Sequence, residues 1–383
     1  MSIQLKGITW NHSRGYLPMV ATSQRFSEIH SDIQISWEKR SLQQFADFPL
    51  QGLIDQYDLL VIDHPWAGYA AMHRVLVPLN EYVSADFLAD QAANSVGASH
   101  ISYQFAGSQT ALAIDAATPV ASYRADLLAE YELQLPTTYE QVLDLARMGR
   151  VIFPAIPVDS LMNFYMFCAT LGEEPFLSSE YVISEATGIL ALDYLRELAA
   201  LCPAQIYEWN PIAIYEQLSS LDHWVYCPFA YGYANYARVG YSHHIVNFTD
   251  TVSLGSHGLL QSTLGGTGIA ISASCKQLDA ALRYAQYAAS PKVQRTLYYE
   301  SGGQPGHRGA WVDSTVNLSS HDYFKRTLPT LDRAFLRPRY DGYLHFQDRA
   351  GEYVQQYMQD GGSARAVLER LNDIYRDSRL TIR

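Results

Sequence analysis

The sequence predicts an α/β fold divided into two domains. Its 383 residues exceed what one hydrophobic core ordinarily holds, so two cores are expected. Short apolar segments alternate with amphipathic ones from the N-terminus onward, an order that is typical of a parallel or mixed sheet flanked by helices. Hydrophobic residues make up 48% of the chain and charged residues 17%, which is the composition of a packed globular protein.

The first part of the chain predicts three strands joined by two helices. The apolar run 59–62 behind Asp58 is short, rich in branched side chains and followed by Pro65. It therefore predicts a strand that is buried on both faces and leaves the sheet at the proline. The other elements expected here are strands at Leu5–Trp10 and Ile33–Glu38 and helices at about Tyr16–Ile29 and Gln43–Gln56.

The rest of the chain predicts mostly helices. Segment 81–100 looks irregular, 101–115 looks extended, and the chain is expected to cross into a second domain at 116–119. Helices are expected at about 124–131, 138–148, 160–171, 187–202, 212–221, 279–290, 291–300, 322–328, 345–359 and 364–376, and strands at 151–154, 224–230 and 268–272.

Charge and motif content argue against several classes of function. The formal net charge of -12 argues against nucleic-acid binding, because no basic stripe is present to neutralise phosphates. No segment reaches the ~18–20 apolar residues of a membrane span. The sequence contains neither GxSxG nor HExxH, and neither a metal nor a cofactor is expected. The cysteines Cys168, Cys202, Cys227 and Cys275 lack zinc spacing and are interpreted as buried thiols, with a Cys202–Cys227 disulfide left open.

The N-terminus leaves the cellular location open. The segment MSIQLKGITW leads directly into the first strand, without the basic and apolar regions of a signal peptide. Either a signal peptide has been removed and the protein is periplasmic or extracellular, or Met1 is the native start and the protein is cytoplasmic. Free cysteines and the methionine start slightly favour the second expectation.

Polar and aromatic side chains follow the first and third predicted strands. Ligands in open α/β sheets collect beyond the carboxyl ends of strands, and sugar sites combine aromatic rings with planar polar groups. The candidate ligand-binding residues at these two strand ends are Trp10, Asn11, His12, Arg14, Asp63, His64 and Trp66. The alternatives are a capped helix start with Arg14 in solvent, and a strand end with Trp66 packed on the core.

Four segments spread over most of the chain carry a family resemblance. They are ITWNHSRGYLPMVATSQRFSEIHSDIQISWE, YDLLVIDHPWAGYAAMHRVLVPLNEYV, LPTTYEQVLDLAR and GGTGIAISASCKQLDAALRYAQYAASPKVQRTLYYESGGQPGHRGAW. In this order the chain resembles the family 1 extracellular solute-binding proteins of ABC importers, which include sugar-binding proteins.

The resemblance implies a two-lobe periplasmic-binding-protein-like fold of type II. Each lobe would be a mixed sheet flanked by helices, with the ligand in a cleft at the hinge. Lobe one is expected at 1–115 and 266–311, and lobe two at 116–265 and 312–383. The chain departs from the family pattern at Tyr57, where proline is usual, and it lacks the lipoprotein cysteine of many members, which leaves export open.

The same resemblance points to further candidate ligand-binding residues. They are Asp115 at the expected hinge, Asn163, Trp209 and Tyr231 in lobe two, Gly266, the cationic pair His307 and Arg308, and Tyr340 and His345 near the cleft. The alternatives are a hinge-stabilising hydrogen bond for Asp115, core packing for Asn163 and the aromatic residues, and hinge flexibility for Gly266.

The sequence therefore predicts a solute-binding protein for ABC-type import. The expected ligand is small and polar: a carbohydrate, a sugar acid or a related carboxylate. The protein is expected to act as a monomer, to carry out no chemistry and, if exported, to bind an ABC permease. The alternative is a cytoplasmic enzyme or ligand sensor built on the same fold, with His12, Asp63, His64 and Arg308 as its functional residues.

Overall fold

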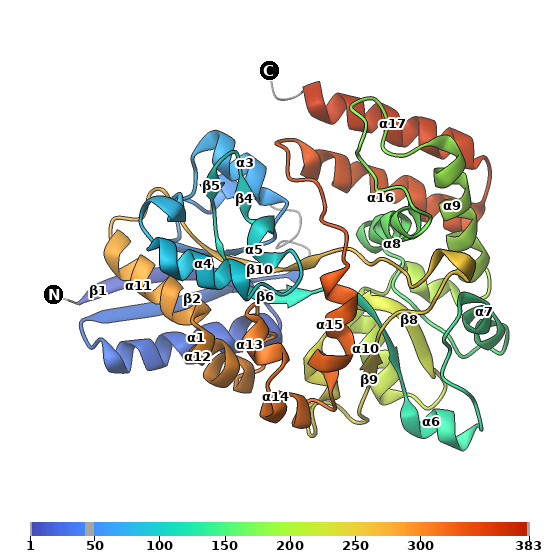
Figure 1. Cartoon of the computed structure of the whole chain (residues 1–383), viewed down its shortest axis with the longest axis horizontal. Coiled ribbons are helices and arrows are strands. Elements are labelled where there is room, and N and C mark those ends of the chain that lie inside the picture. The colour runs from blue at the N-terminus through green and yellow to red at the C-terminus, as the bar shows by residue number, and fades with distance from the viewer. Residues whose placement is uncertain (1, 43–49, 381–383) are drawn as a thin grey trace. The chain divides into compact units, whose positions relative to one another are not determined.

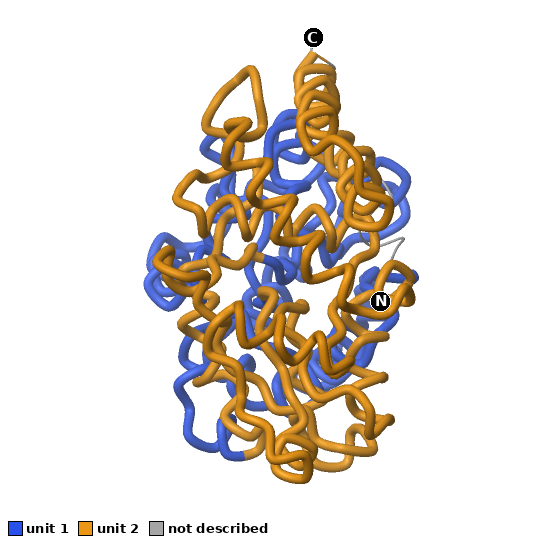
Figure 2. Tube along the Cα trace, turned by 90° about the vertical axis from the view of Figure 1, so that its right-hand side faces the viewer, with its two compact units in different colours: residues 1–117, 265–318, 339–341 blue, residues 118–264, 319–338, 342–383 orange. Residues whose placement is uncertain are grey.

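The computed structural model describes residues 2–42 and 50–380. The chain divides into two compact units, which Figure 2 shows in different colours. Unit 1 comprises Met1–Ala117, Gly265–Leu318 and Arg339–Asp341, and unit 2 comprises Thr118–Leu264, Ser319–Pro338 and Gly342–Arg383. These bounds differ from the expected lobes chiefly at 312–318 and 339–341, which belong to unit 1.

Unit 1 is built on a five-stranded sheet with the order β2-β1-β3-β10-β6. Its strands are β1 (Ile3–Trp10), β2 (Ile33–Arg40), β3 (Leu59–Ile62), β6 (Leu112–Ala117) and β10 (Gly265–Ile271). Strand β1 runs parallel to β2 and β3, whereas β10 runs antiparallel to both β3 and β6. The sheet is therefore mixed, and β3 is fully buried, as its apolar run predicts.

This topology brings the carboxyl ends of β1, β3 and β6 and the amino end of β10 to one edge of the unit 1 sheet. Strands β1, β3 and β6 point the same way, because β10 is antiparallel to both of its neighbours. Their carboxyl ends, at Trp10, Ile62 and Ala117, therefore lie at the same edge as the amino end of β10, at Gly265. Ligands of open α/β sheets bind outside such an edge.

Helices and short elements complete unit 1, and Figure 1 labels most of them. The helices are α1 (Ser13–Ile29), α3 (Trp66–His73), α4 (Ala85–Ala93), α5 (Ser99–Ser102), α11 (Leu278–Ala289), α12 (Pro291–Val293), α13 (Arg308–Trp311) and α14 (Ser314–Leu318). The pair β4 (Gln104–Phe105) and β5 (Ser108–Gln109) forms a small separate sheet. Apolar side chains of α1 and α11, including Phe26 and Tyr284, pack in one core with those of the sheet strands.

Unit 2 combines a small antiparallel sheet with long helices. Its sheet has the order β8-β7-β9, with β7 (Pro119–Tyr123), β8 (Tyr226–Tyr231) and β9 (Asn247–Thr249). The helices are α6 (Ala125–Glu130), α7 (Tyr139–Arg147), α8 (Pro157–Thr170), α9 (Glu185–Ala199), α10 (Pro211–Ser220), α15 (Tyr323–Asp332), α16 (Tyr343–Asp360) and α17 (Ala364–Leu380). Helix α8 is buried along most of its length and packs against α9 and α16.

Several predicted elements differ from the structure. The segment expected to be irregular contains α4, which begins after the capping residue Ser84. The strand expected at 151–154 reduces to a single parallel bridge between Val151 and Tyr226. The helix expected at 291–300 contains a π-helical turn at Gln294–Tyr298. Of the helix expected at 43–56, residues 43–49 lie outside the described residues, and Leu50–Gly52 form a short 3-10 turn.

All four cysteines are free thiols. Cys168 and Cys227 are buried, as predicted, whereas Cys202 and Cys275 are only partly buried. Burial raises the pKa of the Cys202 thiol to about 12, so this group is protonated at neutral pH.

Candidate ligand-binding site

The centre of the candidate site is a buried ion pair between Arg14 and Asp115. Arg14 lies in the first turn of α1, and its Nε donates to Asp115 Oδ2 at 2.8 Å while its Nη2 donates to Oδ1. The exposed fractions of the two residues are 4% and 1%. Burial raises the pKa of the Asp115 carboxyl, and the Arg14 guanidinium counteracts this rise. The two-pronged bond cancels both charges at the sheet edge.

His12 caps the helix that carries Arg14. Its Nδ1 accepts a hydrogen bond from the Arg14 backbone N–H at 3.0 Å. Burial and then the positive charge of Arg14 lower the pKa of His12 to about 4, so the imidazole is neutral at neutral pH. Asn11 precedes this cap with an exposed side chain, and its backbone N–H donates to Arg40 O at 2.7 Å. The predicted capped helix start is thus present, but Arg14 is buried and not in solvent.

Gly266 and Thr267 lie directly beside this ion pair. Thr267 is the register partner of Asp115 in the β10–β6 pairing, and Gly266 is that of Ala116. Gly266 has a φ of +107°, and a Cβ added there would lie 2.3 Å from Asp115 O. The predicted site residue Gly266 therefore permits a close backbone approach that an L-residue would prevent.

The third strand leads to Asp63, His64 and Trp66. Asp63 Oδ1 accepts from the His64 backbone N–H at 2.8 Å and lies 3.2 Å from His64 Nδ1. The His64 side chain is buried and meets the Tyr103 ring edge-on, with centroids 6.4 Å apart. Trp66 begins α3 and is 6% exposed, and its Nε1 has no hydrogen-bond partner among the described residues.

Tyr340 belongs to a short return of the chain to unit 1, against α3. Arg339, the preceding residue, donates from Nη1 to Gln104 O at 2.8 Å. A Cβ added at Gly68 of α3 would lie 1.6 Å from Arg339 O and 3.1 Å from the carbonyl carbon of Tyr340. Tyr340 therefore lies in the same unit as Trp66, in a segment whose backbone packs against α3, although the sequence-based division assigned it to the second lobe.

Three other predicted residues of unit 1 have mainly structural contacts. Trp10 is 3% exposed and belongs to the hydrophobic core, where the absence of a Cβ at Gly15 gives its ring room. His307 Nε2 lies 3.5 Å from Asp90 Oδ2, and burial lowers the pKa of His307. Arg308 donates from Nε to Ser95 O at 3.0 Å. The His307 side chain thus contacts α4 itself, and the Arg308 side chain contacts the segment that follows α4.

The four predicted residues of unit 2 contact different parts of that unit. Asn163 is buried and donates from Nδ2 to Pro154 O at 3.1 Å. Tyr231 shares a hydrogen bond of 3.0 Å with the Thr263 hydroxyl. Trp209 is half-buried ahead of α10, and His345 is exposed on α16, 3.2 Å from Arg349.

Sequence reasoning missed two buried polar residues. The Thr267 hydroxyl and Asp159 Oδ2 are buried and have no hydrogen-bond partner among the described residues. Burial raises the pKa of Asp159 to about 8. Asp159 lies one helical turn before the predicted Asn163 on α8, a spacing that could have directed attention to it. The pairing that places Thr267 beside Asp115 has no local signal in the sequence.

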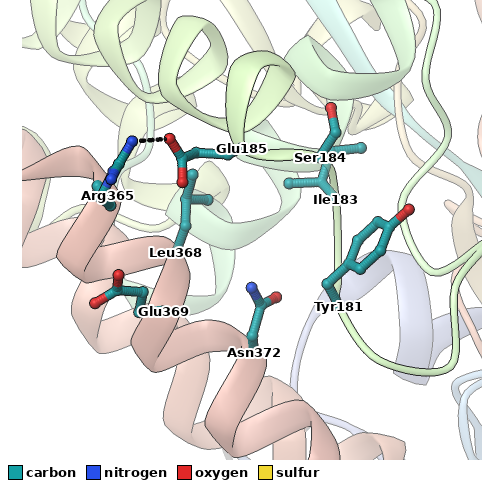
Figure 3. A pocket seen from close by; sticks show the side chains of 8 residues that line it. All are labelled: Tyr181, Ile183, Ser184, Glu185, Arg365, Leu368, Glu369 and Asn372. Atoms are coloured by element: carbon teal, nitrogen blue, oxygen red, sulfur yellow. Dashed lines mark hydrogen bonds and ion pairs between the residues drawn. The ribbon is translucent and has the colours of Figure 1, made fainter.

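A groove in unit 2 is separate from all of these residues. It has a volume of about 360 Å³ and lies between the start of α9 and α17 (Figure 3). Its lining residues are Tyr181, Ile183, Ser184, Glu185, Arg365, Leu368, Glu369 and Asn372. Glu185 and Arg365 form an ion pair across one end of the groove (Figure 3).

Two further findings hold for the part of the chain that the structure describes. Within 2–42 and 50–380, no helix is long and apolar enough to cross a membrane. The same residues contain no group of three or more His, Cys, Asp or Glu side chains that could hold a metal ion.

Comparison with known proteins identifies the class of protein. The profile of the bacterial extracellular solute-binding proteins matches residues 10–295, and the chain belongs to this family. This family membership agrees with the resemblance seen in the sequence. No curated protein matches the sequence.

Solved structures match the chain over almost its whole length. A maltose-bound MalE3 from T. maritima has a TM-score of 0.85 at 15% identity, and the alignment covers 99% of this chain and 100% of that one. A solute-binding protein from Agrobacterium radiobacter with bound ribitol has a TM-score of 0.79 at 18% identity, with 98% of each chain covered. A substrate-binding protein from Listeria monocytogenes in complex with cycloalternan has a TM-score of 0.83 at 13% identity, with 99% of each chain covered. The predicted two-lobe periplasmic-binding-protein fold is thereby confirmed.

Proposed function

We propose that the protein binds an uncharged sugar or polyol and delivers it to an ABC permease. Membership of the solute-binding family supports the transport role. The solved structures of similar fold carry maltose, ribitol and cycloalternan, which supports a hydroxyl-rich ligand. The observation that carries the choice of ligand is the buried, mutually neutralised pair of Arg14 and Asp115.

The charges at the sheet edge favour an uncharged ligand over a carboxylate. Arg14 already gives two donors to Asp115, so its positive charge is balanced within the protein. His12 is neutral at neutral pH, because its pKa is lowered to about 4. A sugar hydroxyl donates and accepts hydrogen bonds without bringing charge. An anion at this edge would be repelled by the Asp115 carboxylate, and the positive charge of Arg14 is already balanced by that carboxylate.

The residues proposed to contact the ligand include those around this edge of unit 1 and a smaller set in unit 2. In unit 1 they are Asn11, His12, Arg14, Asp63, Trp66, Asp115 and Gly266. The residues Trp10, His64, His307, Arg308 and Tyr340 are proposed to hold these side chains and the surrounding backbone in place. In unit 2, Trp209 and Tyr231 have the aromatic faces that suit stacking on a sugar ring, and Asn163 and His345 are further polar candidates. The comparisons do not favour the alternative of an enzyme or sensor on the same fold.

Thermal denaturation with candidate ligands tests the proposal. Maltose, ribitol and mannitol are compared with gluconate, a sugar acid, each at several concentrations. A ligand that binds only the folded state raises its stability by about 2.7 kcal/mol at one hundred times its Kd. We expect an upward shift in Tm with at least one neutral compound and none with gluconate. A larger shift with gluconate than with every neutral compound would contradict the proposed ligand class.

A further inference from the structure

The Thr267 hydroxyl is buried and makes no hydrogen bond with the residues that the structure describes. Thr267 is 5% exposed, and within residues 2–42 and 50–380 its Oγ1 has no hydrogen-bond partner. Buried hydroxyls in folded proteins are nearly always bonded, since leaving one unbonded costs stability. Thr22 in the same unit follows the rule, because its Oγ1 donates to Pro18 O at 2.6 Å and lies 3.0 Å from Tyr284 OH.

The pairing of β10 with β6 places Thr267 on the same face of the sheet as Asp115. The two residues are directly opposite each other in an antiparallel pair, so their side chains point to the same side at neighbouring positions. Asp115 is paired with Thr267 and Ala113 with Gly268, so β6 has one extra residue, Ile114, at this step. Such bulges redirect side chains and are common next to binding sites.

The chemistry of this position fits a ligand hydroxyl. Both oxygens of Asp115 accept from Arg14, so the Thr267 hydroxyl is the uncharged polar group beside a balanced ion pair. A threonine hydroxyl donates one hydrogen bond and accepts others, as a sugar hydroxyl does. A hydroxyl of a bound polyol could therefore accept a hydrogen bond from the Thr267 hydroxyl and donate one to it. Such bonds would compensate for the lack of a partner for Thr267 among the described residues.

We propose that the Thr267 hydroxyl hydrogen-bonds a hydroxyl group of the bound sugar or polyol and contributes to its specificity. This inference rests on the proposed function. It assigns Thr267 as a ligand-contacting residue at the amino end of β10, next to Gly266, where the positive φ brings the backbone against Asp115.

The test compares Thr267→Val, which keeps the shape and removes the hydroxyl, with Thr267→Ser and the control Thr22→Val. Urea unfolding without ligand and calorimetric titration with maltose and ribitol are measured for each full-length protein.

Thr267→Val is expected to unfold at the same urea concentration as the wild type or higher, because no bond is lost. Its Kd for the bound compound is expected to rise at least about tenfold, a loss of about 1.4 kcal/mol, and Thr267→Ser should keep most of the affinity. Thr22→Val should unfold at lower urea and keep the Kd.

The outcomes separate this inference from the proposed function. A wild-type protein that binds neither compound overturns the proposed function, and the inference falls with it. A wild-type protein that binds, together with a Thr267→Val variant of unchanged Kd, overturns the inference alone. If Thr267→Val loses as much stability without ligand as Thr22→Val, the hydroxyl is bonded within the fold and the inference is wrong.

Discussion

Arg14 of α1 and Asp115 of β6 are 101 residues apart in the sequence and form a two-pronged ion pair that solvent scarcely reaches. A buried ion pair of this kind binds the start of a helix to the end of a strand and leaves no net charge. The pair matters for the free energy of unfolding mainly because either charge would be strongly unfavourable in this buried position without the other. The same pair therefore bears on both stability and the charge of the ligand.

Removing one partner of this pair should destabilise unit 1 strongly. Arg14→Met leaves the Asp115 carboxylate buried without its partner, and we expect a loss of about 3–5 kcal/mol in the free energy of unfolding. Urea unfolding at neutral pH measures the loss. The control is Arg147→Met, which breaks a pair with Asp144 in which both side chains are more than half exposed. That change should cost less than about 1 kcal/mol, and equal losses in the two variants would show that the buried pair has no special weight.

Alanine at Gly266 should disturb the same edge through the backbone. The added Cβ would lie 2.3 Å from Asp115 O, and the φ of +107° is unfavourable for any L-residue. We expect Gly266→Ala to lower the free energy of unfolding by about 2 kcal/mol or more. Gly52→Ala is the matched control, since nothing lies within 4 Å of a Cβ added there. Comparable urea midpoints for the two variants would refute the argument.

The sequence predicts the strand ends of the site because their signals are local. The apolar run before Asp63 and the proline after it mark the end of β3, and the first strand and helix are marked in the same way. Helix α4 also has local signals, Ser84 at its cap and Asp86 in its first turn, which the sequence interpretation did not use. The family motifs then fix the order of these elements.

Long-range relationships are what the sequence does not predict. Nothing near Arg14 indicates that its partner is Asp115, since their contact depends on how β6 pairs with β10. Trp10 illustrates the converse case. An aromatic residue at a strand end suits a stacking platform or a core equally well, and only the packing against Gly15 shows that it is core.

Asp159 should make the protein less stable as pH rises. Burial raises its pKa from 3.8 to about 8 in the folded state, so between these values the unfolded chain is ionised while the folded chain keeps its proton. Stability is therefore lost across this window, by at most about 1.4 kcal/mol per pH unit. Asp159→Asn should remove the loss, so that its advantage over the wild type grows between about pH 5 and pH 8 in urea unfolding. Asp279→Asn, at a side chain that is 91% exposed, is the control and should show no such growth.

His12 should make the protein less stable as pH falls. Its pKa is lowered from 6.5 to about 4 in the folded state, so between these values the unfolded chain takes up a proton that the folded chain refuses. The neutral imidazole makes its full contribution to the free energy of unfolding above about pH 6.5. On the order of 3 kcal/mol of this contribution is lost by about pH 4. His12→Asn keeps an oxygen that can cap α1 and removes the titration, so its urea midpoint should fall less steeply with acid than that of the wild type.

His345→Asn, on the exposed face of α16, should follow the wild-type pH profile. Parallel pH profiles for His12→Asn and the wild type would mean that the cap is not the acid-sensitive group.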